Sequence, residues 1–307
     1  MNTEVMSVPP QVPLAARLPG PVGRVWARRP RARSNGARLA GLCMLAVAIG
    51  ASVFVPLLAT YSPGAIVAAP YSAPSASHPF GTDTLGRDVL VRVFSAGRLD
   101  LAIAAVTVLL SIALGCVVGV IAGAARRRWV DVVLMRFVDA VIAFPFLVLV
   151  LVLIVIVGST RSFGPLPAGA PAAVCGIVLG NWAFYARLAR GQCLALRDSD
   201  FVLAARLLGL PPRRILLRHL LPPILRVIAA YAVADAVMVI TVVASLSYIG
   251  VGIQSPAPEW GTIMYDGRAV LSSAWWITVF PGAVLAFTGL GLSLVADATL
   301  ARMEGMR

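Results

Sequence analysis

Long apolar runs, separated by short segments rich in arginine or proline, dominate the sequence. A membrane-spanning α-helix needs roughly 20 predominantly apolar residues. Six runs approach or exceed that length, at 39–60, 99–124, 132–158, 168–186, 223–249 and 274–299. The fourth is the weakest, because Pro171, Asn181 and Arg187 leave it only a short apolar centre. The pattern predicts an all-α polytopic membrane protein with six transmembrane helices, the last five forming a core over 98–300.

The segments outside these runs differ in character. Residues 1–38 are rich in proline, arginine and glycine and lack apolar periodicity, which predicts a disordered tail. The run 39–60 is longer than the apolar region of a signal peptide, so we expect a retained span. Residues 61–97 contain several prolines and predict an ordered connection that begins with turns. Residues 301–307 form a short tail.

The connection at 187–222 has the signals of two short helices. Asp198 and Asp200 offer oxygen atoms for an N-cap and acidic groups for a first turn. Gly209 is placed to end the first helix, and Pro212 suits the first turn of a second. Two interpretations of this basic segment are open: a docking element for another protein, or an anchor on anionic membrane lipid.

Composition excludes several function classes. Hydrophobic residues make up 59 % of the 307 residues and charged residues only 13 %, whereas soluble domains carry about 25 % charged residues. All 26 basic residues are arginines, against 13 acids. Without lysine the chain has no P-loop, whose lysine must reach the nucleotide phosphates. Any ATP that drives this protein is therefore hydrolysed by another chain.

The arginines are distributed unevenly along the chain. With six spans, 21 of the 26 arginines fall on the side that holds both termini, and five fall on the other. Arginine accumulates in cytoplasmic loops. The bias predicts a cell-membrane protein with both termini in the cytoplasm and residues 61–97 outside. Nucleic-acid binding is disfavoured, because each arginine cluster adjoins an apolar run.

The sequence offers little material for a metal site or a catalytic site. Its four cysteines, at 43, 116, 175 and 193, are far apart, and the two histidines are His78 and His219. No C-x-x-C or H-E-x-x-H motif is present. We therefore predict no catalytic residue, no metal ligand and no cofactor on this chain.

Six stretches of the sequence resemble a known family. D-F-V-L-A-A-R-L-L-G and R-H-L-L-P, within 200–222, are similar to the "EAA" loop of ABC-importer permeases. Four other motifs match in order: H-P-F-G-T-D-T-L-G-R-D-V-L at 78–90, D-A-V-I-A-F-P at 139–145, S-L-S-Y-I-G-V-G-I-Q-S-P-A-P-E-W-G at 245–261, and S-A-W-W-I-T-V-F-P-G at 273–282. Together they resemble the C-type permease subunit of the dipeptide, oligopeptide and nickel importers.

This resemblance implies a type I ABC-importer permease fold and a non-catalytic role. The implied partners are a homologous B-type permease, two cytosolic ATPase subunits that bind ATP and Mg²⁺, and an extracytoplasmic solute-binding protein. Di- or oligopeptides are the expected substrates, with nickel or another small solute as the alternative. The implied ATPase-coupling residues lie in one segment: Asp198, Asp200, Leu203, Ala204, Ala205, Gly209, Arg213, Arg214 and Arg218.

The sequence departs from the family pattern at two positions. Leu203 stands where the family usually has glutamate before the two alanines, and Val243 stands where a glutamate commonly precedes Ala-Ser-Leu-Ser. The first departure removes a polar contact expected at the ATPase. Asp198 or Asp200 is available to supply that acidic contact instead.

A few charges inside or beside the spans are candidates for the translocation path. Asp235 lies some twelve residues into the fifth run, and its charge must face the path, a neighbouring span or the partner permease. Arg87 and Asp88 are candidates for an outer gate, or else pair with each other. Asp139 is expected to pair with Arg136, one turn away on the same helix.

A repeat of glycines in the second apolar run concerns the packing of helices. Gly115, Gly119 and Gly123 recur every four residues, which predicts close helix packing in the second span.

A self-sufficient secondary transporter would need midplane coupling acids and often internal repeats. Asp235 alone gives that alternative little support.

Overall fold

The computed structural model describes residues 31–125, 127–158, 160–164 and 166–304. The predicted disordered tail lies mostly outside the described residues, although its residues 31–38 belong to the first helix. The elements are α1 (Arg31–Leu58), α2 (Val89–Ala124), α3 (Arg128–Ala143), α4 (Phe146–Val157), α5 (Ala170–Arg197), α6 (Asp200–Leu207), α7 (Pro212–Ile215), the π-helical turn η3 (Leu216–Leu220), α8 (Leu221–Tyr248), α9 (Trp260–Gly267), the 3₁₀ turn η4 (Arg268–Val270) and α10 (Trp276–Glu304).

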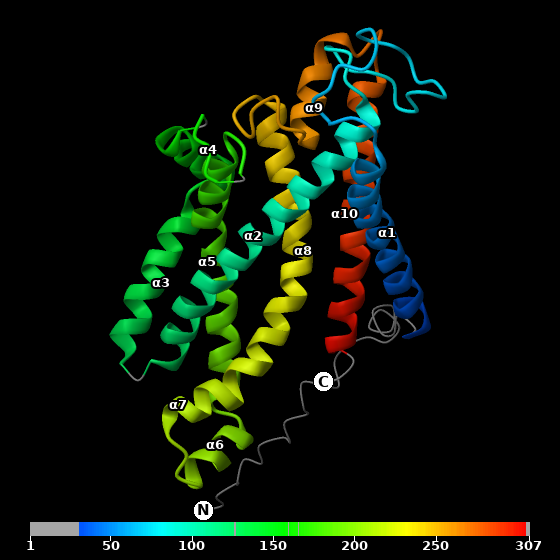
Figure 1. Cartoon of the computed structure of the whole chain (residues 1–307). Helices are drawn as coiled ribbons and strands as arrows, with labels where there is room; N and C mark the ends of the chain where they lie inside the picture. Colours follow the sequence, from blue (N-terminus) through cyan, green and yellow to red (C-terminus); the bar gives the residue numbers. More distant parts are fainter. Residues whose placement is uncertain (1–30, 126, 159, 165, 305–307) are drawn as a thin grey trace, which may run out of the picture.

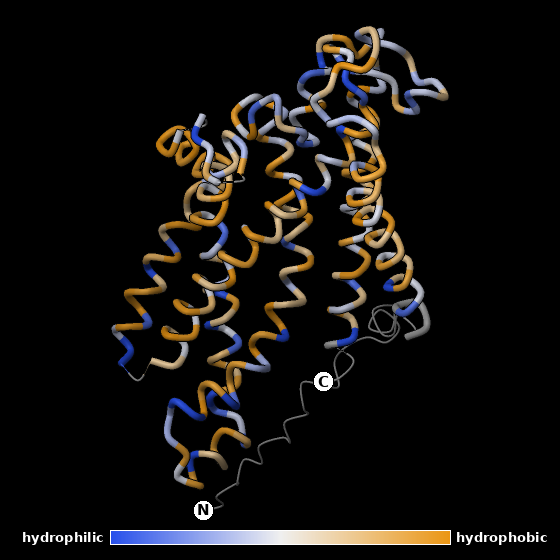
Figure 2. Tube along the Cα trace, in the orientation of Figure 1, coloured by the Kyte–Doolittle hydropathy of each residue, from blue (hydrophilic) through white to orange (hydrophobic). Residues whose placement is uncertain are grey.

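The all-helical membrane architecture is confirmed. Among the described residues, five helices are long and apolar enough to cross a membrane, and a bent pair, α3 with α4, makes up to six spans. Figure 2 shows apolar residues along the middle of the long helices and hydrophilic residues gathered toward their ends. Two boundaries differ from expectation: α2 begins at Val89, inside the predicted connection 61–97, and α10 continues past residue 300.

The third apolar run is broken rather than continuous. α3 and α4 meet at an angle of 90°. Phe144, between them, has an extended backbone (φ −75°, ψ 138°) because the ring of Pro145 disfavours the helical conformation for the residue before it. Pro145 also lacks the N–H that a continuing helix would use. The run 132–158 therefore changes direction after Ala143.

The weakest predicted span, α5, is the most enclosed helix. Within its apolar window 72 % of the residues are buried, against 17–44 % for the other four single helices. It contacts α2, α3, α4 and α8 (Figure 1). A helix surrounded by protein needs less apolar surface than one facing lipid, which is why its polar residues are tolerated.

The predicted glycine repeat of α2 packs against α5. A β-carbon on Gly115 would collide with Cβ of Tyr185, and one on Gly119 would collide with the carbonyl oxygen of Ala186. Gly123 approaches Cβ of Cys193, 2.7 Å from where its own β-carbon would be. The repeat thus permits close backbone approach within the subunit.

The two ends of the bundle carry different structures. At one end lie α6 and α7, together with the start of α1 and the end of α10 (Figure 1). We call this the α6 end. At the other, the α9 end, the connection 59–88 and α9 cover the ends of α2 and α10.

Candidate functional site

The segment 198–220 forms a bent pair of short helices, which we call the helical elbow. Ser199 occupies the N-cap position of α6, but no side chain caps this helix. The Ser199 hydroxyl instead donates to the carbonyl of Leu196, and Asp198 pairs with Arg197 at 3.2 Å. The predicted side-chain N-cap is therefore wrong. Asp200 stays as an exposed acid in the first turn, where it complements the helix dipole.

Gly209 ends α6 as predicted. Its φ is +73°, in the left-handed region that glycine enters without the strain a β-carbon would cause. Its N–H donates to the carbonyl of Arg206, and the N–H of Leu210 donates to the carbonyl of Ala205. These two bonds form a Schellman motif, which satisfies the last carbonyls of the helix and fixes the bend.

α6 has one buried face and one exposed face. Val202 and Ala205 are buried against the rest of the chain, with Ala205 only 4 % exposed. Ala204 is exposed, as are Leu203 (53 %) and Leu207 (82 %). The two alanines thus lie on different faces of α6, one exposed and one buried. Ala205, expected from the resemblance to be an ATPase-coupling residue, is packed inward, because its small side chain lets α6 lie close to its own bundle.

The second half of the elbow runs directly into α8. α7 begins at Pro212, η3 follows, and Leu221 donates its N–H to the carbonyl of Leu216 within this π-helical turn. The helix passes Pro222 and Pro223 unbroken, as their missing N–H groups fall in the first turn of α8. Pro212–Tyr248 is therefore one continuous helical segment of 37 residues, which joins the elbow to the fifth predicted span.

The three predicted arginines of the elbow all have exposed side chains. Arg213 and Arg214 lie on α7, and Arg218 lies on η3. Beyond them, Val243 is buried in α8. A glutamate at that position would need a buried partner, so the valine suits the packing around it.

Asp235 faces a neighbouring span. It is 4 % exposed, and one of its carboxylate oxygens accepts hydrogen bonds from Asn181 Nδ2 at 2.7 Å and from the Tyr185 hydroxyl at 2.8 Å. Both donors belong to α5. We expected this charge to face the translocation path, a neighbouring span or the partner permease. In the structure it faces a neighbouring span, and the contact joins α8 to α5.

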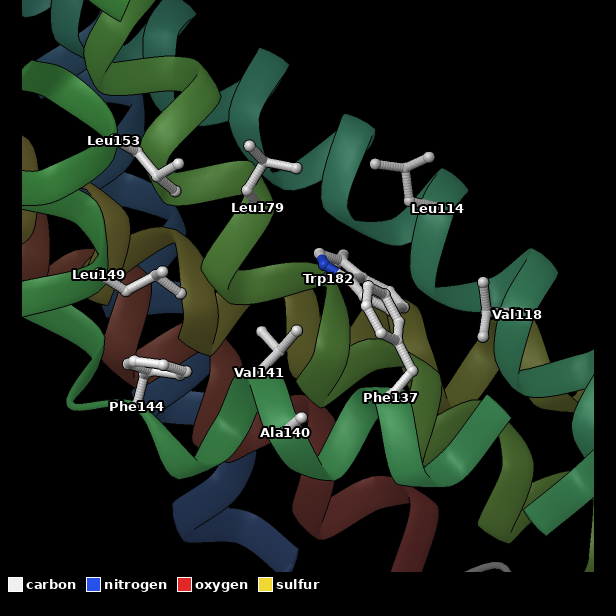
Figure 3. A pocket seen from close by; sticks show the side chains of 10 residues that line it. All are labelled: Leu114, Val118, Phe137, Ala140, Val141, Phe144, Leu149, Leu153, Leu179 and Trp182. Carbon is white, nitrogen blue, oxygen red and sulfur yellow. The ribbon is translucent and has the colours of Figure 1, made fainter. Parts of the chain in front are cut away.

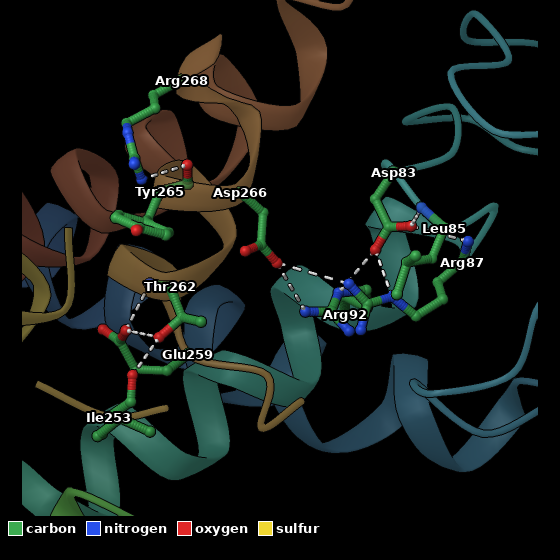
Figure 4. Close-up of polar contacts among 10 residues, drawn as sticks. All are labelled: Asp83, Leu85, Arg87, Arg92, Ile253, Glu259, Thr262, Tyr265, Asp266 and Arg268. Atoms are coloured by element: carbon green, nitrogen blue, oxygen red, sulfur yellow. Dashed lines mark hydrogen bonds and ion pairs between the residues drawn. The ribbon is translucent and has the colours of Figure 1, made fainter. Parts of the chain in front are cut away.

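At the α9 end, Arg87 pairs with Asp83 and Asp266 (Figure 4) rather than with Asp88. Arg87 Nε lies 2.6 Å from Asp83 Oδ2, and its terminal nitrogen lies 3.5 Å from Asp266 Oδ2 in α9. Arg92, fully buried, lies 3.3 Å from the same Asp83 oxygen. Burial raises the pKa of Asp266, and the two guanidinium groups oppose that rise.

Asp88 has a different set of partners. It is the N-cap of α2 and accepts a hydrogen bond from the backbone N–H of Val91. Its other oxygen contacts His78 Nδ1 at 2.7 Å and accepts from the Tyr61 hydroxyl at 2.9 Å. The connection 59–88 is therefore fastened to α2 and α9 by buried polar groups, as a fixed structure.

Sequence reasoning did not single out Glu259, which organises the start of α9. Its carboxylate accepts hydrogen bonds from the backbone N–H groups of Gly261 and Thr262 and from the Thr262 hydroxyl (Figure 4). Beside it, the N–H of Trp260 donates to Asp100 of α2. Burial raises the pKa of Glu259. An acid placed directly before Trp260–Gly261 was the available signal of an N-cap.

The ion pair predicted between Asp139 and Arg136 is wrong. Asp139 contacts Arg187 of α5 at 2.7 Å, and Arg190 contacts Asp131 of α3 through two hydrogen bonds. α3 is thus linked to α5 by two pairs, of which the exposed Asp139 pair adds little stability.

A groove of about 530 Å³ opens between α2, α3, α4 and α5 (Figure 3). Its lining carries aliphatic and aromatic side chains: Leu114, Val118, Phe137, Ala140, Val141, Phe144, Leu149, Leu153, Leu179 and Trp182. Such a surface suits hydrocarbon chains and leaves most amide groups without partners. No cluster of three or more potential metal ligands is found in the described part of the chain.

Known proteins of one transport family match this chain. Residues 115–304 match the family model of the binding-protein-dependent transport system inner membrane component. A protein of Brucella suis biovar 1 named as a peptide permease is 35 % identical over 283 residues, covering 91 % of this chain and 90 % of the relative. The dipeptide transport system permease protein DppC of Alkalihalophilus pseudofirmus is 31 % identical over 266 residues, covering 86 % and 84 %.

Solved structures share the fold. An inward-facing structure of the MetNI methionine ABC transporter matches with a TM-score of 0.52 at 20 % identity, covering 67 % of this chain and 95 % of that one. This similarity shows the type I importer permease fold. Together with the family match and the near full-length relatives, it assigns the chain: it belongs to the binding-protein-dependent transport system inner membrane components, the permease subunits of ABC importers.

Proposed function

We propose that this permease conducts di- or oligopeptides. The proposed substrate class rests on the similarity of this chain to a peptide permease and a dipeptide permease, which extends over more than four-fifths of the chain. The alternative of nickel or another small solute concerns the same class of importer. The self-sufficient secondary transporter is excluded by membership of a family whose transport depends on binding proteins.

The α6 end is the cytoplasmic end in this proposal. The start of α1, the connection between α2 and α3, the elbow and the end of α10 all lie at that end. Together with the adjoining ends of α3, α5 and α8 they carry most of the arginines in the described part of the chain, which favours the cytoplasmic side. Both termini are then cytoplasmic, and the connection 59–88 and α9 face outward.

The elbow is the element that we propose docks on an ATPase subunit. Leu203, Ala204 and Leu207 share its exposed face, which offers an apolar surface with Asp200 at its start. In this chain Leu203 supplies an apolar contact where the family usually has glutamate. Of the three arginines expected to meet carboxylates of the ATPase, with lipid phosphates as the alternative, we assign that role to Arg214 and Arg218. Arg213 lines a cavity beside the elbow instead.

Continuity with α8 makes the elbow suited to transmit movement. A displacement of the Schellman bend moves a rigid 37-residue helix, and Asp235 passes that movement to α5. A rigid-body motion needs a stiff connection of this kind. The proposed assembly contains this chain, a homologous permease, two ATPases that bind ATP and Mg²⁺, and an external solute-binding protein.

The polar cluster at the α9 end is the proposed outer gate. Arg87 and Asp88 act there through Asp83, Asp266 and His78 rather than as a pair. Asp235 contributes by positioning α5 and α8 beside the path.

Uptake in a defined complex tests the substrate class. This chain, its partner permease, both ATPases and the binding protein are reconstituted in vesicles, and uptake of a radiolabelled dipeptide and of ⁶³Ni²⁺ is measured. We expect ATP-dependent dipeptide uptake that is lost when this subunit is omitted. Nickel uptake without dipeptide uptake would replace the proposed substrate and leave the family assignment intact.

A further inference from the structure

A cavity of about 740 Å³ lies between the elbow and the ends of α2 and α5. Three arginines from three elements face it: Arg197 at the end of α5, Arg206 on α6 and Arg213 on α7. No acid is among the described residues that line it. The remaining lining residues are Ala124, Gly209, Leu210, Pro211, Pro212, Ile215, Leu216 and Leu220.

Most N–H donors of the three guanidinium groups make no hydrogen bond to the described residues. Arg197 donates one terminal N–H to the carbonyl of Gly123, and its Nε contacts Asp198. Arg206 donates one terminal N–H to the carbonyl of Arg197. Arg213 has no hydrogen-bond or ion-pair partner among the described residues. A guanidinium carries five N–H donors, so most donors of this cluster are unused.

The cavity lies on the opposite side of α6 from its exposed apolar face. With 100° per residue, Arg206 and Gly209 fall on the side of Val202 and Ala205, which are buried. Leu203, Ala204 and Leu207 point the other way. A protein docked on the exposed face would therefore leave the arginine cavity open.

We infer that this cavity binds the phosphate headgroup of an anionic phospholipid. Three arginines around one space match phosphate, which guanidinium groups bind through paired N–H donors. Basic pockets between membrane helices at the cytoplasmic surface are typical sites for anionic lipid headgroups. The lipid thereby steadies the bend between α6 and α7.

The position of the cavity favours lipid over a soluble anion. It adjoins Ala124 and Arg197, the ends of two membrane-spanning helices, and so lies at the level where a bilayer has its headgroups. Leu210, Leu216 and Leu220 add apolar surface that a glycerol backbone and the start of an acyl chain would cover.

Photo-crosslinking in the assembled transporter tests the inference. The complex is placed in phosphatidylcholine nanodiscs with a minor fraction of phosphatidylglycerol bearing a photoactivatable group, and labelled peptides are mapped. We expect labelling of residues 197–216, reduced about tenfold by Arg213→Gln, since a charge-assisted contact is lost. Arg226→Gln is the matched control: it removes the same charge from an exposed arginine near the start of α8, which neither lines the cavity nor belongs to the proposed ATPase contacts. Arg213→Lys, which keeps the charge but loses the paired N–H donors, should give labelling between that of the wild type and that of Arg213→Gln.

Three outcomes would overturn the lipid site. Equal losses in Arg213→Gln and Arg226→Gln would indicate general attraction to a basic surface. Equal labelling by a phosphatidylcholine probe with the same photoactivatable group would show that the headgroup is not selected. Loss of labelling in excess inorganic phosphate would assign the cavity to a soluble anion. None of these measurements depends on peptide uptake. The lipid site can therefore be disproved while the proposed transport function stands, and the reverse also holds.

Discussion

The hydroxyl of Tyr185 donates a hydrogen bond of 2.8 Å to a carboxylate oxygen of Asp235. These residues belong to α5 and α8, the two helices that flank the elbow in sequence. Asn181 of α5 donates to the same oxygen. The elbow is thus held between two helices that are themselves joined by a buried polar contact, so force applied at the elbow reaches both.

Removing this contact should weaken the bundle. Tyr185→Phe deletes one charge-assisted hydrogen bond, worth about 1.5–3 kcal/mol. We expect a lower unfolding midpoint for the purified complex, measured by intrinsic fluorescence. Tyr248→Phe is the control, because Tyr248 is exposed at the end of α8 and its hydroxyl bonds no other described residue. Equal midpoints for the two variants would show that the Tyr185 bond adds nothing to stability.

A side chain at Gly209 should strain the bend of the elbow. Gly209→Ala places a β-carbon at φ +73°, which costs about 1–2 kcal/mol, although no atom blocks the space. We expect weaker stimulation of ATP hydrolysis by substrate-loaded binding protein, with normal membrane insertion. Gly191→Ala is the matched control, since that glycine lies inside α5 with open space around its β-carbon position. If both variants keep full stimulation, the bend is not required for coupling.

The sequence predicted features that depend on neighbouring residues and missed those that depend on contacts between distant parts of the chain. Gly209 and the Gly115 repeat were readable because a helix end and a small-residue face are local patterns. The cluster of Arg92 with Asp266 joins residues far apart in the chain, and no local pattern pairs them. The exposure of Ala204 and the burial of Ala205 depend on which side of α6 meets the bundle, which only the tertiary packing decides.

Glu259 should give the complex a pH-dependent stability. Its pKa in the folded chain is raised by burial, so folding favours the protonated acid. The contribution is full below the pKa of an unfolded glutamate and is lost as pH rises through the folded pKa. Unfolding midpoints between about pH 4 and pH 8 should therefore decrease toward neutral pH more in wild type than in Glu259→Gln. Parallel curves for the two proteins would contradict this.

The proposed orientation predicts which surface thiols are accessible. In a variant whose exposed Cys43 and Cys175 are replaced by alanine, a cysteine at exposed position Leu207 should react with a membrane-impermeant maleimide only from the cytoplasm. A cysteine at exposed Ser75 should react only from outside. Labelling of inverted and right-side-out vesicles measures this, and the reverse result would place the elbow away from any cytosolic ATPase.

The two alanines of α6 should respond differently to enlargement. Ala204→Leu adds volume on the exposed face and should reduce co-purification of the ATPase while the permease keeps its unfolding midpoint. Ala205→Leu forces a larger side chain into the packed inner face, which costs about 1–3 kcal/mol, and should lower the midpoint of the permease itself. ATPase co-purification and the unfolding midpoint, measured on the same preparations, separate the two effects. If Ala204→Leu retains the ATPase fully while Ala205→Leu loses it without any change in midpoint, the docking face is the inner one and the proposed assignment of the α6 faces is wrong.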